Sequence, residues 1–149
     1  MAGETIVVWG TPRTLEASGA SITNNSVVQA DDASYSTVTH GDSYPDAEFV
    51  LTCAFGTAPT EGTVVSLFAR PLNIDSTNDA EVPEAARATV FIGNFVVNNV
   101  TSTQYIVMNG IFAQDVPKEA DYYLLNNATG QTLSSGWKLV VIPRSYKAA

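Results

Sequence analysis

The sequence contains few charged residues and few of the side chains that carry out most protein chemistry. Only 15% of its 149 residues are Asp, Glu, Lys or Arg, whereas ~25% is typical of globular proteins. It has one histidine, His40, and one cysteine, Cys53. A single cysteine excludes an intramolecular disulfide, and its place in the apolar run FVLTCAF predicts a small buried side chain rather than a reactive thiol. Zinc is also excluded, because one His and one Cys cannot supply the usual protein ligands without several carboxylates.

Basic residues are scarce as well. Seven Lys and Arg stand against fifteen Asp and Glu, which leaves a formal net charge of −8. The basic residues are scattered along the chain, whereas a nucleic-acid-binding surface needs them clustered so that several phosphates are neutralised together. We therefore predict no nucleic-acid partner, and the acidity also disfavours an anionic membrane surface.

Targeting and membrane-spanning segments are lacking too. The opening MAGETIVVWG has neither the basic region nor the apolar stretch of a signal peptide, and the chain has no apolar run of the ~18 residues that suggest a membrane helix. The sequence thus predicts a protein that is made in a cytoplasm and used there or released by lysis, with no membrane partner.

No arrangement of residues predicts nucleophilic catalysis. His40 lies in a turn-like segment, VTHGDSYPD, and a triad would need it beside Ser43 and either Asp42 or Asp46. No serine lies in the strand, turn and helix setting of a nucleophile elbow. We expect His40 to be a solvated turn residue.

Carboxylates offer two further sites, and neither is favoured. A glycosidase would need a pair such as Asp115 with Glu119 or Asp121 across a cleft, and nothing in the sequence predicts that cleft. A calcium site would use the oxygen-bearing side chains of the acidic loop. These are Asp75, Asn78, Asp79 and Glu81. Their spacing lacks the alternation and internal glycine of an EF-hand, so a solvated loop is the preferred interpretation. We predict no enzyme, no metal and no cofactor.

Aromatic residues leave a glycan-binding module open as an alternative. They could build a sugar-stacking platform on a sheet, although most aromatics on strands pack in a core or against a neighbouring strand. The candidates are Trp9, Tyr35, Tyr44, Tyr105, Tyr122, Tyr123, Trp137 and Tyr146.

What the chain has in quantity is short apolar runs. Most last five to nine residues and are rich in Val, Ile, Phe, Tyr and Thr, which favours strands over helices. The predicted strands are 5–9, 26–30, 35–39, 49–55, 63–70, 89–97, 104–111, 122–126 and 137–142. Segment 71–88 has no period of two and is predicted to be a long surface loop. Pro143 and the short tail after it are expected to end the last strand.

Turn residues between these runs suggest which strands pair. Residues 49–55 and 63–70 flank GTAPTEG, and the sequence predicts that they form a central antiparallel hairpin. Residues 122–126 and 137–142 are predicted to form the last pair. About eight or nine strands without helices predict an all-β antiparallel sandwich of the jelly-roll or Greek-key type.

The first 25 residues stand apart from this pattern. Gly, Pro and Ser separate the apolar IVVW from the strands that follow. We divide the chain into an N-terminal arm or edge strand, residues 1–25, and a β-sandwich domain, residues 26–149. Ile6, Val7, Val8 and Trp9 either anchor the protein to an adjacent subunit by adding an edge strand to it, or form the first strand of the protein's own sandwich.

The sequence also resembles a known family of proteins. The turn AFGTAPTEGT, the strand VTSTQYIVMNGI and the turn NNATGQTL look like segments of small virion proteins from tailed bacteriophages, and the similarity covers about residues 49–146. None of these segments is a catalytic motif.

This resemblance implies a capsid decoration, or cement, protein. Such a protein is a β-sandwich that binds the outside of an assembled head, commonly as a homotrimer, and bridges neighbouring subunits of the major capsid protein. The family has no catalytic residues to transfer to this chain. Another virion component, such as a tail or fibre and receptor-binding piece, remains an alternative at this stage.

Overall fold

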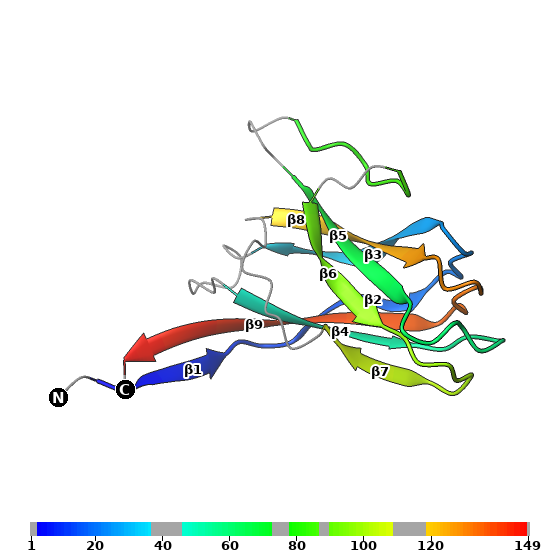
Figure 1. Ribbon diagram of the computed structural model, residues 1–149. Helices are drawn as coiled ribbons and strands as arrows, with labels where there is room; N and C mark the ends of the chain where they lie inside the picture. Colours follow the sequence, from blue (N-terminus) through cyan, green and yellow to red (C-terminus); the bar gives the residue numbers. More distant parts are fainter. Residues whose placement is uncertain (1–2, 37–45, 73–77, 87–89, 109–118, 149) are drawn as a thin grey trace.

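The protein is all-β in the part that the structure describes. The computed structural model describes residues 3–36, 46–72, 78–86, 90–108 and 119–148, which contain nine strands and no helix (Figure 1). The strands are β1 (Thr5–Trp9), β2 (Arg13–Gly19), β3 (Val27–Ser36), β4 (Asp46–Cys53), β5 (Val64–Pro71), β6 (Val90–Val96), β7 (Gln104–Val107), β8 (Glu119–Asn127) and β9 (Trp137–Ala148).

The strands form two antiparallel sheets packed face to face. The larger sheet has the order β1-β9-β4-β7, with β2 also pairing to β9, and the smaller has the order β3-β8-β5-β6. The pairs β5 with β6, β4 with β7, β3 with β8 and β2 with β9 are nested along the chain, which is the strand order of a jelly roll. The predicted all-β sandwich is confirmed.

Both predicted hairpins are wrong. β4 pairs with β7 and β9, whereas β5 pairs with β6 and β8, so the chain between β4 and β5 crosses from one sheet to the other. The chain between β8 and β9 crosses back in the same way. A loop with Pro59 and two glycines reverses the chain equally well within a sheet or between sheets, so turn composition does not settle the pairing.

Several strand boundaries differ from the sequence prediction, and one strand was not predicted. The predicted strands 26–30 and 35–39 belong in part to one strand, β3, whose pairing with β8 shifts register between Ala30 and Tyr35. β2 was not predicted, because it lies within the segment that the sequence marks as an arm. β9 continues through Pro143 to Ala148, since the carbonyl of Pro143 still accepts a hydrogen bond from the Gly10 amide at 2.8 Å.

The core lies between the two sheets. Its largest fully buried side chains include Trp137, Tyr122, Phe49, Phe55 and Phe95. Alternate residues of β4 and β9 are buried, as expected for strands with one face on the core. Leu15 of β2 and Ile22 also belong to this core, so part of the segment that the sequence assigns to an arm lies inside the sandwich.

One part of the larger sheet extends away from the sandwich. β4 pairs with β9 as far as Arg144. Beyond that residue, β1 is the one described strand that pairs with β9, in a register that runs from Trp9 opposite Arg144 to Thr5 opposite Ala148. We call this two-stranded segment, residues 5–9 and 144–148, the ribbon. Figure 1 shows it projecting from the sandwich, with both chain ends at its tip.

Candidate interaction surface

The ribbon carries apolar side chains on both of its faces. Residues directly opposite one another in an antiparallel pair lie on the same face. Val7 and Trp9 therefore share a face with Tyr146 and Arg144, and this face continues the outer surface of the larger sheet. Ile6 and Val8 lie on the other face, which continues the core side of that sheet.

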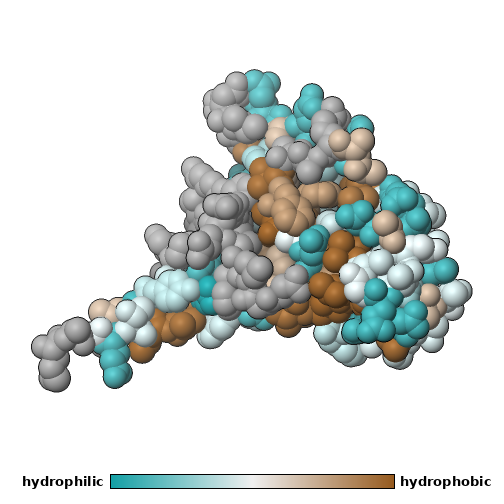
Figure 2. Space-filling model, viewed as in Figure 1, coloured by the Kyte–Doolittle hydropathy of each residue, from teal (hydrophilic) through white to brown (hydrophobic). Residues whose placement is uncertain are grey.

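These ribbon side chains lie largely in solvent. Trp9 is 50% exposed, and Ile6, Val7 and Tyr146 are also exposed. Figure 2 shows the resulting apolar surface on the projecting segment. A two-stranded ribbon without a core beneath it is only marginally stable in water, so these side chains form a surface suited to contact with another protein.

A buried ion pair lies where the ribbon leaves the sandwich. Nη2 of Arg144 donates a hydrogen bond to Oδ2 of Asp46 at 2.9 Å, and both side chains are buried. The guanidinium also lies over the Trp9 ring, 5.9 Å from its centroid, and over the Tyr146 ring at 5.2 Å. Arg144 thus ties β9 to the start of β4 and to both strands of the ribbon, through charge and through the ring faces.

A second exposed apolar surface lies on β7, the strand at the opposite edge of the same sheet. Tyr105 is 77% exposed and Val107 is 44% exposed, and both point to the outer face, while Gln104 and Met108 are buried. Gln104 accepts from the Asn98 amide at 2.8 Å and donates to the Asn98 carbonyl at 3.0 Å, which anchors the start of the strand.

Three carboxylates that the sequence analysis did not group come together where β2 meets β3. One oxygen from each of Glu16, Asp31 and Asp32 lies within 4.8 Å of the others. Glu16 is buried and accepts from the amides of Ser18 at 2.9 Å and Asp31 at 3.2 Å, and Asp32 accepts from the Ala17 amide at 2.6 Å. The Glu16 and Asp32 carboxylates thus connect β2 and β3 through the backbone amides of Asp31 and Ala17. Their contact between residues 15 apart could not be read from spacing along the chain.

The described residues include only some of the predicted catalytic and calcium-site candidates. His40, Asp42, Ser43, Asp75 and Asp115 lie outside the described residues. Asp46, a candidate third member of a triad, instead pairs with Arg144. Glu119 and Asp121, the two alternative partners of Asp115 in the glycosidase pair, both lie on β8.

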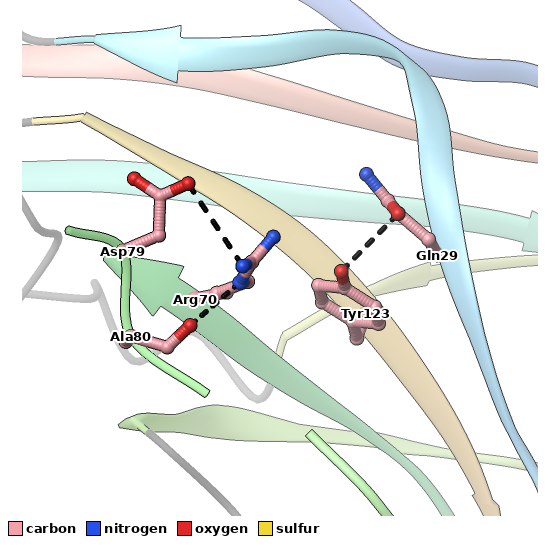
Figure 3. Close-up of polar contacts among 5 residues, drawn as sticks. All are labelled: Gln29, Arg70, Asp79, Ala80 and Tyr123. Atoms are coloured by element: carbon pink, nitrogen blue, oxygen red, sulfur yellow. Dashed lines mark hydrogen bonds and ion pairs between the residues drawn. The ribbon is translucent and has the colours of Figure 1, made fainter. Parts of the chain in front are cut away.

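Described members of the acidic loop make structural contacts. Nη2 of Arg70 lies 3.8 Å from Oδ2 of Asp79, and Nε of Arg70 donates to the Ala80 carbonyl at 2.7 Å (Figure 3). Burial raises the pKa of Asp121, and the nearby Arg70 partly opposes this rise. These contacts attach the loop to β5.

The aromatic residues do not form a single platform in the part of the chain that the structure describes. Trp137, Tyr122 and Tyr123 are buried, and the Tyr123 hydroxyl hydrogen-bonds to Oε1 of Gln29 at 3.1 Å (Figure 3). The exposed Trp9 and Tyr146 lie on the ribbon, whereas Tyr105 lies on β7 at the other edge of the sheet.

Cys53 lies in the core, as its position in an apolar strand predicts. Burial raises the pKa of its thiol from 9.0 to about 12, because the charged thiolate would lose its hydration. Cys53 therefore stays protonated and unreactive at neutral pH.

Comparison with known proteins identifies no family for this chain. No protein-family model matches it, and no curated protein matches it. A solved structure described as "Bacillus endospore appendages form a novel family of disulfide-linked pili" is similar to 100% of this chain and 95% of its own, with 12% sequence identity and a TM-score of 0.30. A likeness this low carries no argument about function. Within the described residues, no helix has the length and apolar character of a membrane span.

Proposed function

We propose that this protein is a structural component of a tailed-bacteriophage virion. In this role it binds the outer surface of the assembled capsid and stabilises it by bridging neighbouring subunits of the major capsid protein. It is made in the host cytoplasm and acts as a homo-oligomer, for which the resemblance suggests a trimer. Neither nucleic acid nor a membrane is a partner, and no enzymatic activity or cofactor is part of the role.

The observation that carries this proposal is the projecting ribbon. Its apolar side chains, Ile6 and Val7 among them, lie on both faces of a segment beneath which the described residues form no core. Such a segment contributes little to the protein's own core, and it gains stability when another protein covers it. A protein that holds a shell together needs this kind of surface rather than a cleft with reacting groups.

Two further features support the role. The chain is poor in charge. Glu16 and Asp32 accept hydrogen bonds from backbone amides, and Asp46 and Asp79 lie beside arginines. The segments that resemble phage virion proteins include the loop between β4 and β5, the strand β7 and the turn before β9, so they come from both sheets. The likeness therefore concerns the sandwich as a whole and not one motif.

Sedimentation with purified phage heads tests the proposal. The protein should bind expanded heads of the phage that encodes it, and binding should saturate at a fixed ratio to capsid subunits. A variant that lacks residues 1–10 should lose this binding while it keeps its melting temperature. Sedimentation with tails rather than heads would assign the protein to another virion component, and binding to neither, with a response in a glycan screen, would favour a glycan-binding module.

A further inference from the structure

The two outermost strands of the larger sheet are short, but they lack the charges, prolines and bulges that otherwise protect a sheet edge. Exposed edges usually carry charges, prolines or bulges that prevent pairing with another chain. β1 reads TIVVW and β7 reads QYIV, so neither contains a charge or a proline, and each pairs with its one neighbour without a register shift. By contrast, β3 contains Asp31 and Asp32 and a register shift, and β6 pairs with β5 through a register shift.

The backbone of both strands has hydrogen-bonding groups directed away from the sheet. The Gly10 amide donates to the Pro143 carbonyl. Because hydrogen-bonded residues alternate along a strand, the backbone N–H and C=O groups of Ile6 and Val8 face β9, and those of Thr5 and Val7 face away from the sheet. The Met108 amide donates to the Phe49 carbonyl at 3.2 Å, so by the same alternation the backbone N–H and C=O groups of Tyr105 and Val107 face away from the sheet. In the described segments, no strand pairs with either outer edge.

We propose that the β1 edge of one copy adds to the β7 edge of a second copy, so that the larger sheet continues from one molecule into the next. This inference rests on the proposed function and deepens it: the ribbon of each copy anchors to a second copy of this chain, and the linked copies together bind the head, so that loss of the ribbon also loses head binding. β1 and β7 run in opposite directions at the two edges, so antiparallel addition preserves the strict alternation of the sheet.

The side chains of the two strands match in this arrangement. In the register that places Val7 opposite Tyr105, Thr5 lies opposite Val107, and all four side chains lie on the outer face of the sheet. Aromatic and β-branched residues directly opposite one another stabilise a strand pair. The exposed surface of the ribbon and the exposed surface of β7 thus become one continuous apolar surface.

The other face of the ribbon also gains contacts. Ile6 comes opposite Ile106, and Val8 comes opposite Gln104, on the core side of the sheet. Ile106, together with Val90 and Ile92 of β6, is only partly buried against the core at this side of the sandwich. Ile6 and Val8 would extend that apolar side, which no residue of the ribbon reaches within its own molecule because the ribbon lies beyond the sandwich (Figure 1).

Pairing of identical edges is less favourable. If β1 paired with β1 of a second copy, the core-side residues Ile6 and Val8 would stay in solvent, because neither ribbon has a core beneath it. The exposed Tyr105 and Val107 would also remain uncovered. Two molecules that each carry a net charge of −8 repel one another, and the uncharged β1 and β7 edges are segments where they can approach without added repulsion. The contact is then head-to-tail, which closes into a ring or continues as an open chain.

Two lysine substitutions and one matched control test the contact. Val7→Lys should block the β1 edge and Val107→Lys should block the β7 edge, because each substitution places a charge in the apolar contact. Val96→Lys is the control, since Val96 has a similar exposure of 37% and lies on β6, the outermost strand of the other sheet. Analytical ultracentrifugation of the full chain without heads should show assemblies for the wild type and for Val96→Lys, and monomers for the other two.

Mixing the two monomeric variants tests the head-to-tail geometry. The Val107→Lys copy keeps an intact β1 and the Val7→Lys copy keeps an intact β7, so the mixture should form a dimer of one copy each and nothing larger. A wild-type protein that stays monomeric from micromolar to millimolar concentration overturns the inference. So does a Val107→Lys variant that assembles like the wild type, or a mixture that stays monomeric.

Folding and head binding are measured separately. Circular dichroism and melting must match the wild type for each variant, and Tyr105→Lys replaces Val107→Lys if that variant unfolds, because Tyr105 is the most exposed large apolar side chain. The head-free measurement does not depend on the capsid. A protein that assembles through β1 and β7 and ignores heads would contradict capsid binding and leave this inference intact. One that binds heads as a monomer would contradict this inference and the proposed homo-oligomer, and would leave capsid binding intact.

Discussion

Arg144 connects the ribbon to the sandwich, and its buried charge makes that connection sensitive to a single substitution. Asp46→Asn removes the negative charge beside the guanidinium and leaves the shape of the side chain almost unchanged. Removing one partner of a buried ion pair costs about 3 kcal/mol, because the remaining charge stays out of water. We expect the free energy of unfolding, measured in urea at neutral pH, to fall by about this amount.

The same change at Asp79 provides the comparison. The Asp79 carboxylate lies 3.8 Å from Arg70, and both side chains are partly exposed. A solvent-exposed pair contributes at most about 1 kcal/mol. Asp79→Asn should therefore leave the urea midpoint almost unchanged, and an equal loss for both variants would show that burial of the Asp46 pair does not set its contribution.

Cys53 gives the protein a stability that declines at alkaline pH. Its thiol has a pKa of 9.0 when exposed and about 12 in the folded protein, so between these values the unfolded chain releases a proton that the folded chain retains. The contribution of Cys53 to the free energy of unfolding is thus fully present below pH 9, and it is lost as the pH rises toward 12. Cys53→Ala should show a weaker decline over this range in urea titrations. An identical decline in both proteins would contradict the assignment.

Gly19 shows how one residue joins two strands. A methyl group at this position would overlap the Trp137 indole, whose Nε1 donates to the Ala20 carbonyl at 2.7 Å. Gly19→Ala must push the indole away and break that hydrogen bond, and overpacking of this kind costs about 1–3 kcal/mol. We expect a lower melting temperature and altered tryptophan emission in a Trp9→Phe background. Gly56→Ala, where the added methyl meets nothing within 4 Å, should change neither.

At the scale of the elements, the sequence predicted strands well and their partners poorly. Short apolar runs rich in Val, Ile, Phe, Tyr and Thr identified most strands, including β1 and β5, and an alternation of apolar residues identified β4, whose buried residues alternate. Strand pairing depends on which sheet a loop leads to, and the composition of a loop such as GTAPTEG does not distinguish a turn within one sheet from a crossover to the other. β2 was missed because its sequence, RTLEASG, has only Leu15 as a large apolar side chain.

β1 and β2 pair with the same strand, but we expect them to contribute very differently to the free energy of unfolding. β1 lies beyond the sandwich with exposed side chains, whereas β2 places Leu15 in the core. Deletion of residues 1–9 should lower the free energy of unfolding by less than about 1 kcal/mol, within the range of surface changes. Leu15→Ala should lower it by about 2–5 kcal/mol. Urea unfolding of both variants checks this, and loss of folding on deletion of β1 would make the ribbon a structural part of the domain.

At the scale of the whole molecule, the candidate surface was partly visible in the sequence. An apolar segment near the chain start, followed by Gly10 and Pro12, indicated that Ile6 to Trp9 stand apart. The partner strand could not be predicted, because Pro143 suggested an end to β9 where the structure continues it. The exposure of Tyr105 was also hidden, since an alternating strand does not show whether another strand covers its outer face.

The proposed role makes the stability of the capsid depend on occupancy of its outer surface. A ligand that binds only the assembled head stabilises it by about 2.7 kcal/mol per site when its free concentration is ~100 times the dissociation constant. Heads reconstituted with the wild-type protein should therefore release their DNA at a higher temperature than bare heads, measured as the onset of fluorescence from a dye that binds DNA. The variant without residues 1–10 should give the temperature of bare heads, because it retains the sandwich and loses the ribbon. Equal release temperatures for bare heads and saturated heads would contradict a stabilising role, even if the protein binds.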